Sequence, residues 1–169
     1  MYQYPLLLFA LLQGAALALT AQPHAAKLPL RDLLNLMPNE LAGYDQVGKF
    51  KSREIKIGTM SYTVGEKEFS HQRSRVKLLL FDYQDAPVMF EQTTRPWLNT
   101  AVVDSDSVKR QRIEWVGNKG WESENTSTQS AQVALAINQR LVLMLIGENC
   151  RLSDLYTILG IFDLSRFPK

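Results

Sequence analysis

The spacing of hydrophobic residues along the chain predicts three helices. Within residues 29–37, four apolar side chains recur at i, i+3, i+4 and i+7: Leu30, Leu33, Leu34 and Met37. This is one face of an amphipathic helix, and Pro38 favours its end. The same spacing returns in residues 153–162, with Ser153 as the expected N-cap. A third helix is predicted from Asp85, as N-cap, to about Thr94, because Pro96 should end or kink it.

Between these helices the hydrophobic positions alternate with a period of two, which is typical of β-strands. A first group of three strands is predicted at residues 46–57, 59–69 and 73–83. A second group begins with strands at residues 108–117 and 120–127. The run 78–81 is continuously apolar, so we expect its strand to lie centrally in the sheet.

The stretch "SAQVALAINQRLVLMLIGENC", residues 130–150, is the most apolar part of the chain after its first twenty residues. As a membrane helix it would place Asn138, Gln139 and Arg140 at its centre, where Arg alone costs about 2.5–3.5 kcal/mol. We therefore predict a hairpin with Asn138 and Gln139 as its loop and apolar residues on both faces. In that register, Leu135 lies opposite Val142.

The predicted order is helix, three strands, helix, four strands, helix. This order indicates an α+β fold in which an antiparallel sheet of about six to seven strands packs with N-terminal, middle and C-terminal helices. We expect one domain over residues 29–169, preceded by a linker at 22–28.

The first 26 residues carry no acidic or basic side chain other than His24, and residues 6–19 are apolar. This pattern predicts a signal peptide over residues 1–21, cleaved between Ala18 and Gln22, and hence an exported protein, periplasmic or extracellular. The alternative is an uncleaved N-terminal anchor that tethers the domain to a membrane. After signal cleavage we expect no integral membrane span.

Charge and cysteine content narrow the possible chemistry. The 19 basic and 17 acidic side chains are interspersed, which argues against nucleic-acid binding. His24, His71 and Cys150 are too few for a metal site, and we predict no cofactor. Cys150 and His71 are the one nucleophile and base pair that the composition permits, so a small envelope thiol enzyme or hydrolase is an alternative function.

Basic residues form the candidate ligand site. Arg73, Arg75 and Lys77 are predicted to share one face of a strand with His71, and Arg110 and Arg112 share a face of another. Such a face would bind an anionic envelope component, such as lipid headgroups or a polysaccharide, or an acidic protein.

The alternative is that these cations pair with the chain's own carboxylates. With Ser70 and His71 as the hairpin loop, Glu68 would face Arg73 and Glu66 would face Arg75. Three further carboxylates could pair with the later arginines: Glu114, Glu122 and Glu124.

Aromatic residues offer a second candidate surface. Six of them could line a binding groove: Trp97, Trp115, Trp121, Tyr44, Tyr62 and Tyr83. Packing in the core or at the sheet rim is the alternative. Asn125 begins a glycosylation sequon, which matters only in a eukaryotic host.

Several short stretches together resemble a group of uncharacterised exported bacterial proteins. They are "LLNLMPNELAGY", "VKLLLFDY" (a strand ending in Asp), "VGNKGWE", "INQRLVLMLIG" (a strand opened by Arg) and "LGIFDLSRF". The resemblance implies a compact α+β domain similar to the Mog1/PsbP-like sandwiches, which are mostly used for binding and accessory roles. We therefore predict an exported binding or accessory domain rather than an enzyme.

Overall fold

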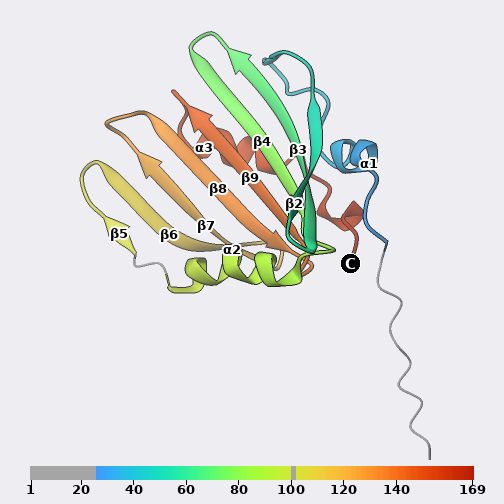
Figure 1. The fold of residues 1–169 in the computed structure, drawn as a ribbon. Helices are drawn as coiled ribbons and strands as arrows, with labels where there is room; N and C mark the ends of the chain where they lie inside the picture. Colours follow the sequence, from blue (N-terminus) through green and yellow to red (C-terminus); the bar gives the residue numbers. More distant parts are fainter. Residues whose placement is uncertain (1–25, 100–101) are drawn as a thin grey trace, which may run out of the picture.

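The computed structural model describes residues 26–99 and 102–169 (Figure 1). The predicted signal peptide and the first part of the predicted linker, residues 22–25, lie outside these ranges. The helices are α1 (Leu30–Asn35), α2 (Pro87–Asn99), α3 (Leu152–Leu159) and the short 3-10 helix η1 (Leu164–Arg166). The strands are β1 (Asp45–Gln46), β2 (Lys51–Ile57), β3 (Met60–His71), β4 (Ser74–Asp82), β5 (Val103–Asp104), β6 (Val108–Trp115), β7 (Asn118–Asn125), β8 (Ser130–Ile137) and β9 (Leu141–Glu148).

The strands form one antiparallel sheet in the order β1-β3-β4-β9-β8-β7-β6-β5, with β2 also paired to β3. The predicted α+β class is confirmed, but the predicted strand number was wrong, because the described residues contain nine strands. The two additional strands, β1 and β5, have two residues each and are too short to show an alternating pattern. β4 lies between β3 and β9, as its apolar run predicted.

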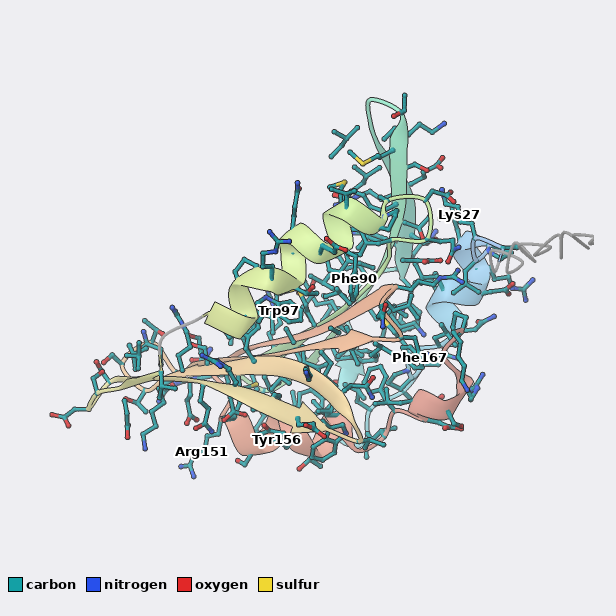
Figure 2. The ribbon with its side chains drawn as sticks, turned by 90° about the horizontal axis from the view of Figure 1, so that it is seen from below. Lys27, Phe90, Trp97, Arg151, Tyr156 and Phe167 are labelled. Carbon is teal, nitrogen blue, oxygen red and sulfur yellow. The ribbon has the colours of Figure 1, made fainter. Side chains whose placement is uncertain are left out.

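Helices lie on both faces of the sheet (Figures 1 and 2). α1 and α3 pack against one face, called here the α1/α3 face, over the large core that contains Leu78, Leu80 and Leu143. α2 crosses the opposite face, called the α2 face, over a smaller cluster around Tyr83 and Phe90. Within the described residues, no helix combines the length and apolarity needed to cross a bilayer.

α1 ends at Asn35, shortly before Pro38, and a buried lysine donates hydrogen bonds to the turn that follows the helix. The Lys67 ammonium donates to the carbonyl oxygens of Met37 at 2.9 Å and Pro38 at 3.2 Å, and to Oδ1 of Asn39 at 2.6 Å. Cations stabilise helix C-termini by compensating unpaired carbonyls. Lys67 lies in β3 and is 1% exposed, so its ammonium reaches these carbonyl groups from the interior of the protein.

The other two helices differ from their predicted ends. α2 continues through Pro96 to Asn99, whereas the sequence placed its end near Thr94. α3 begins at Leu152, with Arg151 rather than Ser153 as its N-cap, and the Asp154 carboxylate accepts the Arg151 backbone N–H at 2.9 Å.

The β8–β9 hairpin is buried on both sides, as predicted, but its predicted register was wrong by one residue. Leu135 lies opposite Leu143 rather than Val142, and the loop has three residues, 138–140. Asn138 and Gln139 both adopt positive φ, near 53°. The longer loop lets Arg140 turn back into the protein.

Arg140 forms a buried ion pair with Asp82, the residue that ends β4. Arg140 Nε and Nη2 donate to the two Asp82 carboxylate oxygens at 2.7 and 2.8 Å, and the side chains are 4% and 0% exposed. Arg140 Nη2 also donates to the Ala26 carbonyl at 3.1 Å, and the Leu28 N–H donates to Asp82 at 3.3 Å. Residues 26–28, inside the predicted linker, are thereby held against the domain.

Candidate binding face

The structure places four of the five predicted basic residues on the α2 face. Arg75 and Lys77 alternate along β4 with Val76 and Leu78, which point into the α1/α3 core. Arg110 and Arg112 alternate along β6 in the same way, opposite Ser123 and Trp121 of β7. Arg73 lies in the β3–β4 turn instead of on a strand face.

The pairing register arranges these residues at the two sides of one surface. One row across the sheet is Lys77, Ile146, Gln132, Ser123 and Arg110, and the next is Leu79, Met144, Ala134, Trp121 and Arg112. Four strand spacings separate β4 from β6, which is about 19 Å. The face therefore has basic residues on β4 and β6 and a polar and apolar floor between them. In Figure 1, α2 crosses only one end of these strands, and no other helix of the described residues lies over this face.

The basic residues on β4 pair with the chain's own carboxylates. Arg75 Nε lies 3.3 Å from Glu68 and Lys77 Nζ lies 3.6 Å from Glu66. The predicted pairs, Glu68 with Arg73 and Glu66 with Arg75, were wrong, because the two turn residues are Gln72 and Arg73 rather than Ser70 and His71. The self-pairing interpretation therefore holds on this side with different partners.

The basic residues on β6 have no such partners. Arg110 and Arg112 are exposed, and no carboxylate in residues 26–99 or 102–169 forms an ion pair with either. The Arg110 guanidinium lies 5.9 Å from the Trp121 ring centre, which is close to the longest distance at which a cation–π interaction forms.

Two carboxylates that the sequence offered to these arginines face the other way. Glu122 lies opposite Val133 on the α1/α3 face, where it accepts hydrogen bonds from Tyr156 Oη and, at 2.5 Å, from Gln111 Nε2. Glu124 accepts the Leu152 N–H at 3.0 Å at the start of α3. Because Tyr156 belongs to α3, the Glu122 carboxylate joins β7 to that helix, and burial together with this contact raises the pKa of the Tyr156 hydroxyl.

A hollow of about 890 Å³ adjoins Arg112, between α2 and the β6–β7 end of the sheet. We call it the α2 groove. α2 contributes Phe90, Thr94 and Trp97 to it, at i, i+4 and i+7, and Figure 2 shows Phe90 and Trp97 on the side of α2 that faces the sheet. The strands contribute Arg112, Glu114, Lys119 and Ala136, among others. Sequence reasoning missed this groove because it ended the helix before Trp97, although the spacing from Phe90 to Trp97 was the available signal.

The predicted aromatic groove does not form as one surface. Trp115 packs against Tyr156, with ring centres 5.4 Å apart, and Tyr44 packs against His71 at 5.7 Å. Tyr62 and Tyr83 contact each other in a tilted arrangement, with ring centres 5.0 Å apart, in the cluster under α2. Trp97 alone among the six lines the α2 groove.

Cys150 and His71 lie near a common neighbour, Tyr44. Its ring packs on His71, and its hydroxyl interacts with the Cys150 thiol. Cys150 is 5% exposed, and burial raises the pKa of its thiol. A raised pKa disfavours the thiolate that a nucleophilic cysteine requires, so this geometry gives the thiol-enzyme alternative little support.

Other candidate chemistry is sparse in the described ranges. Residues 26–99 and 102–169 contain no group of three or more His, Cys, Asp or Glu side chains placed to hold a metal ion. Asn125, the sequon residue, uses its Oδ1 to accept the N–H groups of Ser127 and Thr128 in the turn after β7.

The chain shows no significant match to a family model, to a curated protein or to a solved structure. Functional inference therefore depends on the geometry of the α2 face.

Proposed function

We propose that the protein is an exported binding or accessory domain that attaches to an anionic envelope surface through the β6 side of its α2 face. The supporting observation is the exposed pair Arg110 and Arg112, for which the described residues offer no ion-pair partner. Export and the resemblance to uncharacterised exported bacterial proteins are premises of this proposal, taken from the sequence.

The chemistry of these residues suits lipid phosphate. A guanidinium presents a planar set of donors that matches phosphate oxygens, and it is more weakly hydrated than an ammonium. An exposed arginine with no partner loses no existing ion pair when it binds. Lys119, exposed on β7, adds a further cation beside Arg112 in the wall of the α2 groove.

The β4 side of the same face provides an internal comparison. Arg75 and Lys77 are oriented like Arg110 and Arg112, but each already has a carboxylate within 3.6 Å. Their attraction for an external anion is reduced by that pairing, so the proposal distinguishes two basic pairs that the sequence treats alike.

The test is co-sedimentation with vesicles of phosphatidylcholine alone or mixed with phosphatidylglycerol. Because each basic residue near an anionic membrane contributes about 1 kcal/mol, the Arg110→Gln/Arg112→Gln protein should bind the mixed vesicles about 30-fold more weakly. The matched control, Arg75→Gln/Lys77→Gln, removes the same charge from the paired side and should change binding less than about threefold.

Two outcomes would refute the proposal. One is a wild-type chain that does not distinguish the two kinds of vesicle. The other is equal loss of binding in the two double variants, which would attribute attachment to net charge rather than to the unpaired arginines.

A further inference from the structure

The α2 groove lies between one side of α2 and the neighbouring residues of β6, β7 and β8 with the turns that follow β6 and β8. Phe90 joins Tyr83 and Val142 in a buried cluster, and Trp97 in the C-terminal half of the helix packs against the same cluster. Besides Thr94 and Trp97, the lining includes the small residues Ala136 and Gly117, together with longer polar side chains such as Asn118 and Gln139. From Phe90 to Trp97 the helix advances about 10 Å, so α2 borders the groove over about that length.

The lining of the groove combines an apolar part with a cationic part. The apolar part consists of the partly buried Trp97 and Ala136 and the edge of Phe90, which is 8% exposed, and all three pack in or against the cluster under α2. Arg112 and Lys119 bring two positive charges, against one carboxylate, Glu114. No ion pair in the described ranges involves any of these three side chains.

We propose that the α2 groove binds a single-chain fatty carboxylate. The aliphatic chain lies along Phe90, Trp97 and Ala136, and the carboxylate meets Arg112 and Lys119. Charge complementarity selects an anionic head, because the two cations outnumber Glu114. The volume of about 890 Å³ is large enough for a small molecule with an aliphatic chain, and Trp97 with the edge of Phe90 gives that chain an apolar contact.

This inference rests on the proposed function, because Arg112 belongs both to the exposed basic pair and to the groove. The proposed function names only an anionic surface as the ligand of this face. The inference specifies a single molecule whose aliphatic chain enters the α2 groove. Arg110, which does not line the groove, should contribute to vesicle attachment but not to binding of the free carboxylate.

The experiment is isothermal titration of the full chain with monomeric decanoate, compared with decanol, which lacks the charge, and acetate, which lacks the chain. Decanoate should bind at least tenfold more tightly than either. Arg112→Gln and Lys119→Gln should each weaken decanoate binding by about fivefold to tenfold, whereas Arg110→Gln should leave it within twofold. Ala136→Leu, which places a larger side chain in the groove, should reduce binding without changing any charge.

Both charge variants alter exposed residues, so they keep the test decisive even where Ala136→Leu fails to fold. Decanoate affinity no greater than that of decanol, or equal losses in Arg110→Gln and Arg112→Gln, would overturn the groove assignment. Failure of decanoate binding with normal attachment to anionic vesicles rejects the groove alone. Decanoate binding in a protein that ignores vesicle charge rejects surface attachment alone.

Discussion

The ion pair between Asp82 and Arg140 joins the end of β4 to the turn before β9, and almost none of it is exposed to solvent. Replacing one member leaves an uncompensated buried charge, so Asp82→Leu should lower the free energy of unfolding by about 3–5 kcal/mol. Urea denaturation followed by circular dichroism measures this change.

The double variant Asp82→Leu/Arg140→Met tests whether the loss arises from the orphaned charge. Replacing both charges with apolar side chains should recover about 2 kcal/mol or more of the loss. Full recovery is not expected, because the N–H groups of Leu28 and Gln84 also donate to Asp82. As a comparison, Glu66→Gln breaks a partly exposed pair with Lys77 and should cost less than about 1 kcal/mol. A double variant no more stable than Asp82→Leu would contradict this account.

Lys67 makes stability depend on pH, because its ammonium is buried in the folded protein. Burial lowers its pKa from an ordinary value of 10.5 to about 8. Between these two values the unfolded chain binds more protons than the folded chain, so the free energy of unfolding should rise with pH across this window. The contribution is at most about 1.4 kcal/mol per pH unit.

The measurement compares wild-type and Lys67→Met unfolding at several pH values from 7.5 to 10. The difference in stability between them should grow in favour of the wild type as pH rises. Tyr83 and Cys150, whose pKa values burial raises, act in the opposite direction but equally in both proteins. Parallel pH profiles would show that Lys67 titrates normally.

At the scale of elements, the turns of the hairpins hold local strain. Gln139 adopts a φ of 53° in the β8–β9 loop, a region that a glycine enters without steric cost. Gln139→Gly should therefore stabilise the protein by up to about 1 kcal/mol, the relief of strain being offset in part by the greater freedom of the unfolded chain.

The neighbouring position is the matched control. Asn138 has the same φ, but its Nδ2 donates to the carbonyls of Phe167 at 3.2 Å and Pro168 at 2.8 Å. Asn138→Gly should therefore give no gain or a loss, because it removes both bonds. Thermal unfolding of the two variants separates backbone strain from side-chain bonding, and equal shifts in Tm would contradict the prediction.

The same turns explain which parts of the fold the sequence could predict. Hydrophobic spacing locates β4, β8, β9 and three helices, because burial on a face imposes a period that a short window reveals. Register depends on one or two turn residues. The sequence around His71 does not show which two residues form the β3–β4 turn, and Asn138 does not show whether its loop has two residues or three. In the β3–β4 hairpin the different register gives Arg75 a different carboxylate partner. In the β8–β9 hairpin the longer loop turns Arg140 toward the interior.

The candidate site was predictable to the same extent. Alternation identified Arg110 and Arg112 as neighbours on one strand face. Their lack of partners was not predictable, because Glu122 and Glu124 alternate onto the face that packs α3. The α2 groove could be predicted only if α2 was known to continue past Pro96. Local propensity favours a helix end at this proline, and tertiary contacts override it.

At the scale of the whole molecule, the segment before α1 forms hydrogen bonds and ion pairs with several separate elements of the domain. Lys27 bonds to Glu54, Ser61 and Asp85, which come from β2, β3 and the loop before α2. Ala26 and Leu28 bond to the Arg140 and Asp82 pair. Residues 26–28 thus connect elements that lie far apart in sequence.

A chain that begins at Pro29 should consequently be less stable than one that begins at Gln22. The two partly buried bonds to Arg140 and Asp82 involve charged groups, each worth about 1.5–3 kcal/mol, so we expect a loss of about 3 kcal/mol in urea denaturation. Lys27→Met in the longer chain is the control, and it should cost about 1 kcal/mol or less because those ion pairs are partly exposed. The predicted cleavage between Ala18 and Gln22 would keep this segment in the exported protein, whereas equal stability of the two chains would show that residues 26–28 serve only as a linker.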